Sequence, residues 1–109
     1  MAEELKMQRC VPCEGGVPPV RGGELTALAG EVDDGWKVVD EHHIEREFSF
    51  PDFAKALEFT NAVGAIAEDE GHHPDIELGW GRVNVKLWTH AAGGLTKNDF
   101  IVAAKIDAL

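Results

Sequence analysis

The sequence has few basic residues and no long apolar run. Its 109 residues include 10 Lys and Arg against 20 Asp and Glu, a net charge of −10. Because nucleic-acid binding depends on Lys and Arg that neutralise phosphates, we expect no nucleic-acid partner. The same sign of charge disfavours anionic membranes. No apolar run approaches the roughly 20 residues that span a bilayer, and residues 1–9 lack an apolar secretory segment. A cytoplasmic protein without a membrane partner is therefore expected.

Cysteine is also scarce, and both cysteines lie near the start of the chain. Cys10 and Cys13 form a CxxC pair rather than a secreted disulfide framework. The surrounding segment is rich in Pro and Gly, which oppose regular structure. We interpret residues 1–23 as an extended N-terminal arm and residues 24–109 as one domain. Two thiols supply only half of a structural zinc site, so a disulfide or a plain loop is favoured over zinc.

The remaining sequence divides into helices and strands by its apolar periodicity. Helical spacing predicts helices at 24–32, 51–70 and from Thr96 to about Asp107. Strands are predicted at 36–39, 42–50, 75–79 and 82–90. Short links join the strands in pairs, which is typical of hairpins. The sequence therefore predicts an α+β fold, a four-stranded antiparallel sheet with three helices on one face.

Local signals mark the ends and faces of these elements. Pro51 suits the first position of the 51–70 helix, Asp52 suits the positive end of its dipole, and Gly71 suits its C-terminal cap. Strand 82–90 alternates between two faces. One face carries Val83, Val85, Leu87 and Thr89, and the other carries Asn84, Lys86, Trp88 and His90.

The residues that carry chemistry are concentrated in residues 68–99. His72 and His73 lie between a predicted helix end and Pro74, so they occupy an elbow in which both rings can face one cleft. His90 ends a predicted strand, and a strand exit can meet a helix exit in one pocket. Glu68 precedes His72 by four residues, a spacing that allows it to orient this ring. Asp99 forms a capping box with Thr96, which does not prevent a role in a site.

Two kinds of chemistry fit such a histidine cluster. Imidazoles exchange protons near neutrality because their ordinary pKa is about 6.5, and three of them can also bind zinc with one position left open. The HExxH metalloprotease motif is absent, and adjacent His72 and His73 are awkward ligands for one tetrahedral ion. Proton transfer is therefore favoured. Trp80 and Trp88 either pack against the domain or stack on a flat heterocycle.

The spacing of these residues resembles a known family signature. Glu68-x-x-x-His72-His73-Pro74, then Trp80, His90 and Asp99, is similar to the pattern of pterin-4a-carbinolamine dehydratases. The resemblance covers about residues 25–109. It implies an antiparallel four-stranded sheet with three helices on one side, assembled as a homodimer or homotetramer. It also implies a reaction that removes water from a 4a-hydroxytetrahydropterin without metal or cofactor, recycling the pterin used by aromatic amino acid hydroxylases.

The resemblance also implies residue roles. His72, His73 and His90 are expected to be catalytic, with His73 and His90 as acid and base on either side of the C4a–N5 bond. His72 is expected to bind the pterin or to share the base role. Glu68, Asp99 and Trp80 are expected to bind substrate or orient a histidine, and Asp99 to hold His90.

Two features of the sequence and its resemblance leave the function open. Gly71 stands where some family members carry an acidic residue just before the histidine pair. Some relatives are non-catalytic interaction or assembly proteins with the same fold. The complete histidine set favours the enzyme over that alternative.

Overall fold

A computed structural model describes residues 4–11 and 17–109 and confirms the predicted α+β fold class. Within these residues three α-helices and four strands follow the expected order, together with two 3-10 helices. They are the 3-10 helix Leu5–Met7, α1 (Gly22–Ala29), β1 (Lys37–Val39), β2 (His43–Ser49), α2 (Phe53–Glu70), β3 (Asp75–Gly79), β4 (Arg82–Leu87), the 3-10 helix His90–Ala92 and α3 (Lys97–Asp107).

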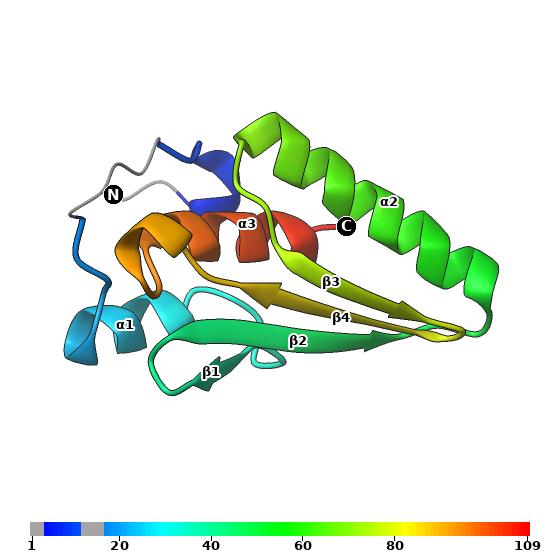
Figure 1. The fold of residues 1–109 in the computed structure, drawn as a ribbon, viewed down its shortest axis with the longest axis horizontal. Helices are drawn as coiled ribbons and strands as arrows, with labels where there is room; N and C mark the ends of the chain where they lie inside the picture. Colours follow the sequence, from blue (N-terminus) through cyan, green and yellow to red (C-terminus); the bar gives the residue numbers. More distant parts are fainter. Residues whose placement is uncertain (1–3, 12–16) are drawn as a thin grey trace.

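The sheet is antiparallel throughout, with the strand order β1-β2-β4-β3 (Figure 1). Strand β4 lies between β2 and β3, the two strands that α2 connects, and α2 packs against β3 and β4. Val83, Val85 and Leu87 of β4 are fully buried, whereas the alternate side chains of Asn84 and Lys86 are not. The predicted alternation of β4 is therefore confirmed, and the apolar face is the one that the helices cover.

The hydrophobic core lies between that face and the helices. Phe100 and Val102 of α3, Val63 of α2 and Ile44 of β2 are all fully buried. The 3-10 helix Leu5–Met7 packs against α3 and adds Leu5, which is 4% exposed. The first described part of the arm is thus docked on the domain.

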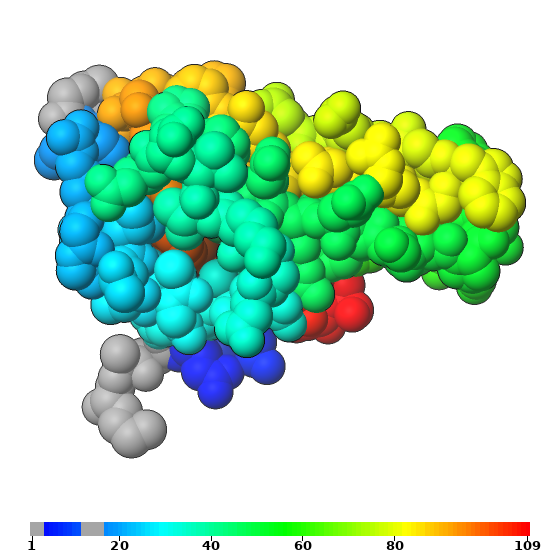
Figure 2. Space-filling model, turned by 90° about the horizontal axis from the view of Figure 1, so that it is seen from below, coloured from blue at the N-terminus to red at the C-terminus, as the bar shows by residue number. Residues whose placement is uncertain are grey.

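The molecule is elongated, and its two ends carry different segments. Figure 2 shows the β3–β4 turn, in yellow, at one end and the segments near the N-terminus and α1, in blue and cyan, at the other. The histidine elbow precedes β3, and His90 follows β4. Both therefore lie at the end of the hairpin opposite to its turn.

Several element boundaries differ from the sequence-based expectation. Helix α2 begins at Phe53 because Asp52 is extended, with φ −160°, and caps the helix by accepting a hydrogen bond from the Lys55 amide at 2.8 Å. Pro51 therefore precedes the cap. Strand β4 ends at Leu87, and Thr89 forms an isolated bridge with Gly94. Helix α1 runs from Gly22 to Ala29, so it begins two residues earlier and ends three residues earlier than expected.

No helix among the described residues is long and apolar enough to cross a membrane.

Candidate functional site

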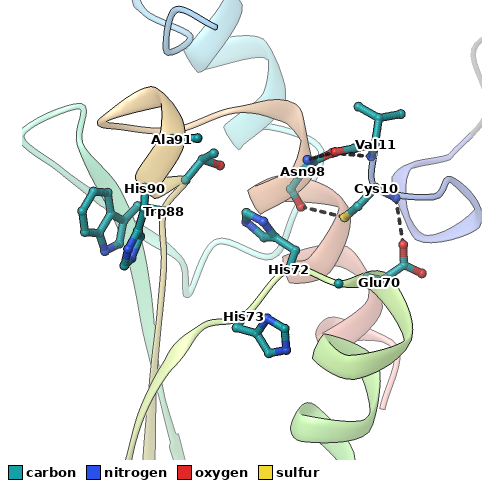
Figure 3. Close-up of a pocket in the computed structure, with 11 residues that line it drawn as sticks. Cys10, Val11, Glu70, His72, His73, Trp88, His90, Ala91 and Asn98 are labelled. Carbon is teal, nitrogen blue, oxygen red and sulfur yellow. Dashed lines mark hydrogen bonds between the residues drawn. The ribbon is translucent and has the colours of Figure 1, made fainter. Parts of the chain in front are cut away.

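An open pocket of about 490 Å³ lies where four segments meet (Figure 3). Its volume is in the range of small-molecule sites. It brings together His72, His73 and His90, which the sequence places in two separate segments. The lining residues are Cys10, Val11, Glu70, Gly71, His72, His73, Trp88, Thr89, His90, Ala91 and Asn98.

His72 is held by a buried carboxylate. Gly71 takes the left-handed conformation, with φ 67°, and caps α2, so the chain leaves the helix at this point as predicted. The His72 ring is 12% exposed, and its Nε2 lies 2.6 Å from Oδ1 of fully buried Asp99. The sequence-based assignment of Asp99 to His90 is therefore wrong.

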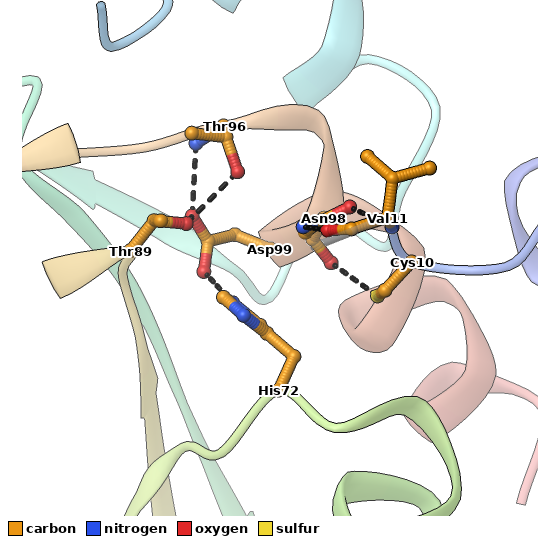
Figure 4. Close-up of polar contacts among 7 residues, drawn as sticks. All are labelled: Cys10, Val11, His72, Thr89, Thr96, Asn98 and Asp99. Atoms are coloured by element: carbon orange, nitrogen blue, oxygen red, sulfur yellow. Dashed lines mark hydrogen bonds and ion pairs between the residues drawn. The ribbon is translucent and has the colours of Figure 1, made fainter. Parts of the chain in front are cut away.

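Asp99 also performs the predicted helix-capping role. Its Oδ2 accepts hydrogen bonds from the Thr96 amide at 2.9 Å and the Thr89 hydroxyl at 2.8 Å (Figure 4). The capping box of α3 is confirmed. Thr89 faces Asp99 because it continues the buried face of β4, whereas His90, the next residue, does not. This alternation explains why Asp99 contacts His72 instead of His90.

His73 is paired with Glu68 at the rim of the pocket. The His73 Nε2 lies 2.5 Å from Glu68 Oε2, and the two side chains are 61% and 78% exposed. The expectation that Glu68 orients His72 through helical spacing is therefore wrong. That spacing holds only while the helix continues, and the left-handed Gly71 redirects the chain before His72.

His90 is exposed and stacks on Trp88. The ring centroids are 3.9 Å apart, with an angle of 26° between the planes. Figure 3 shows the two rings together on the side of the pocket opposite the elbow. Trp88, which the sequence left open between packing and stacking, is therefore part of the pocket wall.

Trp80 is the one predicted site residue that the structure does not bring to the others. It lies in the turn between β3 and β4, is 70% exposed and does not line this pocket. The reason is the hairpin geometry, since the length of β3 separates the turn from the elbow that precedes this strand.

The arm supplies a wall of the pocket that sequence reasoning missed. The Val11 amide donates to Asn98 Oδ1 at 3.1 Å, and Asn98 Nδ2 donates to the Val11 carbonyl at 2.7 Å. The Cys10 amide donates to Glu70 Oε1 at 2.8 Å, and the thiol donates to the Asn98 carbonyl at 3.6 Å. The only available signal was that Asn98 precedes Asp99. Cys10 is a free thiol, and Cys13 lies outside the described residues.

Burial and charge shift the pKa of two groups at this wall. Burial, followed by the charge of Glu70 and a hydrogen bond to it, raises the pKa of Cys10 to about 12. Burial alone would raise the pKa of Glu70, but the Cys10 amide and Lys105 outweigh it and hold this pKa below its usual value. At neutral pH the wall therefore carries a neutral thiol and an ionised carboxylate.

The chemistry of the site is that of oriented imidazoles. A neutral imidazole that donates Nε2–H to a carboxylate presents Nδ1 as a proton acceptor, and the carboxylate stabilises the imidazolium that forms. His72 with Asp99 and His73 with Glu68 are two such pairs. Within residues 4–11 and 17–109, no group of three or more His, Cys, Asp or Glu side chains is arranged to hold a metal ion.

Comparisons with known proteins agree with the resemblance found in the sequence. The family model described as pterin 4 alpha carbinolamine dehydratase matches residues 18–109. A Rubrobacter xylanophilus protein, provisionally named as such a dehydratase, is 54% identical over 97% of this chain and 98% of its own length. A similarly named Rickettsia canadensis protein is 48% identical over 95% of both chains.

Two solved structures share the fold. A Brucella melitensis protein titled a transcriptional coactivator/pterin dehydratase has a TM-score of 0.77 and 34% identity, covering 83% of this chain and 96% of its own. A pterin dehydratase-like protein titled a RuBisCO assembly factor of the alpha-carboxysome has a TM-score of 0.58 and 26% identity, covering 68% and 87%.

Proposed function

Because this chain belongs to the pterin-4a-carbinolamine dehydratase family, we propose that it removes water from a 4a-hydroxytetrahydropterin by histidine acid–base catalysis. The observation that carries the proposal is the meeting of His72, His73 and His90 in one pocket. Each positioned proton transfer typically contributes about 10²- to 10⁴-fold to a rate.

The reaction needs one base and one acid. The base removes the proton from N5, the N5–H electrons form the C4a=N5 double bond, and the C4a–O bond breaks. The acid protonates the departing hydroxyl, so the products are water and a quinonoid dihydropterin. No other reactant is needed for the atoms and electrons to balance.

The placement of the imidazoles supports a division of labour. His73 and His90 lie on different walls of the pocket, and both are exposed enough to reach a substrate. We assign them the acid and base roles on either side of the C4a–N5 bond. His72 is more buried and is held by Asp99, so we assign it to pterin binding or to a shared base role. Glu68 orients His73 in this scheme.

The test is the rate of dehydration of a 4a-hydroxytetrahydropterin, followed by absorbance against the uncatalysed reaction. His73→Ala and His90→Ala should each lower turnover by about 10²- to 10⁴-fold while circular dichroism and the unfolding midpoint stay near wild type. Wild-type rates in both variants would end the acid–base assignment.

We further propose a cytoplasmic homodimer or homotetramer that serves an aromatic amino acid hydroxylase.

A non-catalytic interaction role is the second candidate. The Brucella melitensis protein is described as a transcriptional coactivator as well as a pterin dehydratase, and the carboxysomal protein as a RuBisCO assembly factor. A wild-type protein that does not accelerate the dehydration would favour this second role for the present chain.

A further inference from the structure

The three pocket imidazoles are not held in the same way. His72 and His73 each face a carboxylate, at 2.6 Å and 2.5 Å. Among the described residues, no carboxylate pairs with the His90 ring. Asp99, the carboxylate expected to hold it, is instead bonded to His72, Thr89 and Thr96. His90 is nevertheless exposed, and an exposed imidazole without a partner samples several rotamers.

The indole of Trp88 is the group that the His90 ring contacts. The two residues share one face of the chain because they are two positions apart where it continues from β4. Their rings lie 3.9 Å apart and 26° from parallel, an arrangement that restricts both side-chain torsions of His90. Figure 3 shows this stack forming one side of the pocket.

Trp88 is itself supported from the turn that precedes the neighbouring strand β2. The His42 ring lies 4.4 Å from the indole centroid, and His42 Nδ1 lies 3.1 Å from Nδ1 of His43, the first residue of β2. Two neutral imidazoles satisfy such a contact as donor and acceptor. Burial, aided by the charge of Lys86, lowers the pKa of His43 and so favours its neutral form. A continuous row of rings thus runs from His43 through His42 and Trp88 to His90.

We propose that Trp88, supported by His42, is the positioning residue that holds His90 in its catalytic orientation. This inference rests on the proposed function and adds a third orienting group, an indole, to the carboxylates of Asp99 and Glu68. Acid–base catalysis requires the ring nitrogen within hydrogen-bond reach of the reacting group, and a displacement of about 1 Å is costly. An indole can restrict the ring while leaving both of its nitrogens available.

The kinetic test compares Trp88→Ala with Trp88→Phe. Loss of the stack should lower kcat by about 3- to 10-fold, the factor that corresponds to one aromatic pair. The KM should stay within about twofold, because a positioning residue acts on the transition state. Trp88→Phe retains a ring at this position and should recover most of kcat. Phe53→Ala is the matched truncation of a half-exposed aromatic side chain outside the pocket and should leave kcat unchanged.

The second measurement is the proton NMR spectrum of the His90 ring, assigned with His90→Asn. In the wild type its ring protons should be shifted upfield by the indole. This shift should vanish in Trp88→Ala, while the retained dispersion of the other resonances shows that the variant remains folded.

The outcomes separate this inference from the proposed function. A fall in kcat that Trp88→Phe rescues, together with the lost NMR shift, supports the positioning role. A normal kcat in Trp88→Ala, or an absent upfield shift in the wild type, overturns it. A rise in KM alone also overturns it, because Trp88 would then bind the substrate directly. An inactive wild-type protein overturns both proposals, whereas an active wild type with unaffected Trp88→Ala overturns only this one.

Discussion

At the scale of single residues, the two oxygens of the Asp99 carboxylate have different partners and serve two functions. The carboxylate of Asp99 caps α3 through Oδ2 and holds His72 through Oδ1. Its complete burial leaves these polar groups as its partners, and a buried carboxylate is stable only when such groups surround it. The start of a helix therefore fixes the orientation of a pocket imidazole, and the same contact excludes His90 from that carboxylate.

Cys10 provides a test at this scale. Because its pKa is raised to about 12 by burial and by Glu70, little reactive thiolate is present near neutrality. In a Cys13→Ser background, alkylation by iodoacetamide at about pH 8 should be on the order of 10³-fold slower than in the urea-unfolded protein. Mass spectrometry would measure both rates. Equal rates would show that the arm does not stay docked on Glu70 and Asn98.

At the scale of elements, the ends of α2 determine where the histidine elbow lies. Asp52 caps one end by accepting from the Lys55 amide, and left-handed Gly71 closes the other. The helix between them packs on β3, β4 and α3. The caps define the residue at which helical hydrogen bonding stops, so they also define the direction in which His72 and His73 leave the helix.

Two glycines of this element offer a matched prediction. At Gly64 and Gly71 an added Cβ would lie more than 4 Å from any atom outside the adjoining backbone, so Ala meets no packing clash at either position and only the backbone conformation distinguishes them. Gly64 lies inside the helix, where Ala should stabilise the protein by about 0.5–1 kcal/mol. Gly71 has φ 67°, where Ala should destabilise it by about 1 kcal/mol. Urea unfolding of both variants would measure these changes, and the same sign in both would contradict the assigned cap.

At the scale of the whole molecule, the pocket depends on contacts between distant segments. The arm, the end of α2 and α3 meet at Glu70, whose side chain is 1% exposed. Its Oε1 accepts from the Cys10 amide, and its Oε2 lies 3.3 Å from Lys105 Nζ and 3.5 Å from the Arg9 guanidinium. Within the described part of the chain Oε2 has no hydrogen bond, so its partners are charges. Glu70 therefore links the arm to the domain.

This linkage predicts a pH-dependent contribution to stability. The pKa of Glu70 is lower in the folded state than its ordinary 4.5, so ionised Glu70 stabilises the fold above that value. At about pH 7, Glu70→Gln should lower the free energy of unfolding by about 1–3 kcal/mol. The difference from wild type should shrink as the pH falls below 4.5 and the folded-state carboxylate becomes protonated.

Urea titrations between about pH 7 and about pH 3 would measure this difference. The matched control is Glu58→Gln, because Glu58 lies on the same helix, is 76% exposed and, among residues 4–11 and 17–109, forms an ion pair with Lys55 alone, at 3.7 Å. It should change stability by less than about 0.5 kcal/mol at any pH. A Glu70→Gln deficit that is independent of pH would contradict the role of the charge.

The predictions that succeeded share a local origin. The α2 C-cap at Gly71, the Thr96–Asp99 capping box and the alternation of β4 all involve residues within a few positions of one another. Besides Trp80 and several element boundaries, the predictions that failed were partnerships. Glu68 was expected to orient His72 and Asp99 to hold His90, but the structure pairs Glu68 with His73 and Asp99 with His72.

The sequence by itself determined the elements, their buried faces and the set of pocket histidines, because backbone caps and side-chain periodicity act over one or two turns of chain. Only the tertiary structure decided the strand order, the carboxylate partner of each imidazole, the stack of His90 on Trp88 and the arm as a pocket wall. His72 and Asp99 are 27 positions apart. Whether they meet depends on how α2 and α3 pack against each other and against the same face of the sheet, which no local pattern specifies.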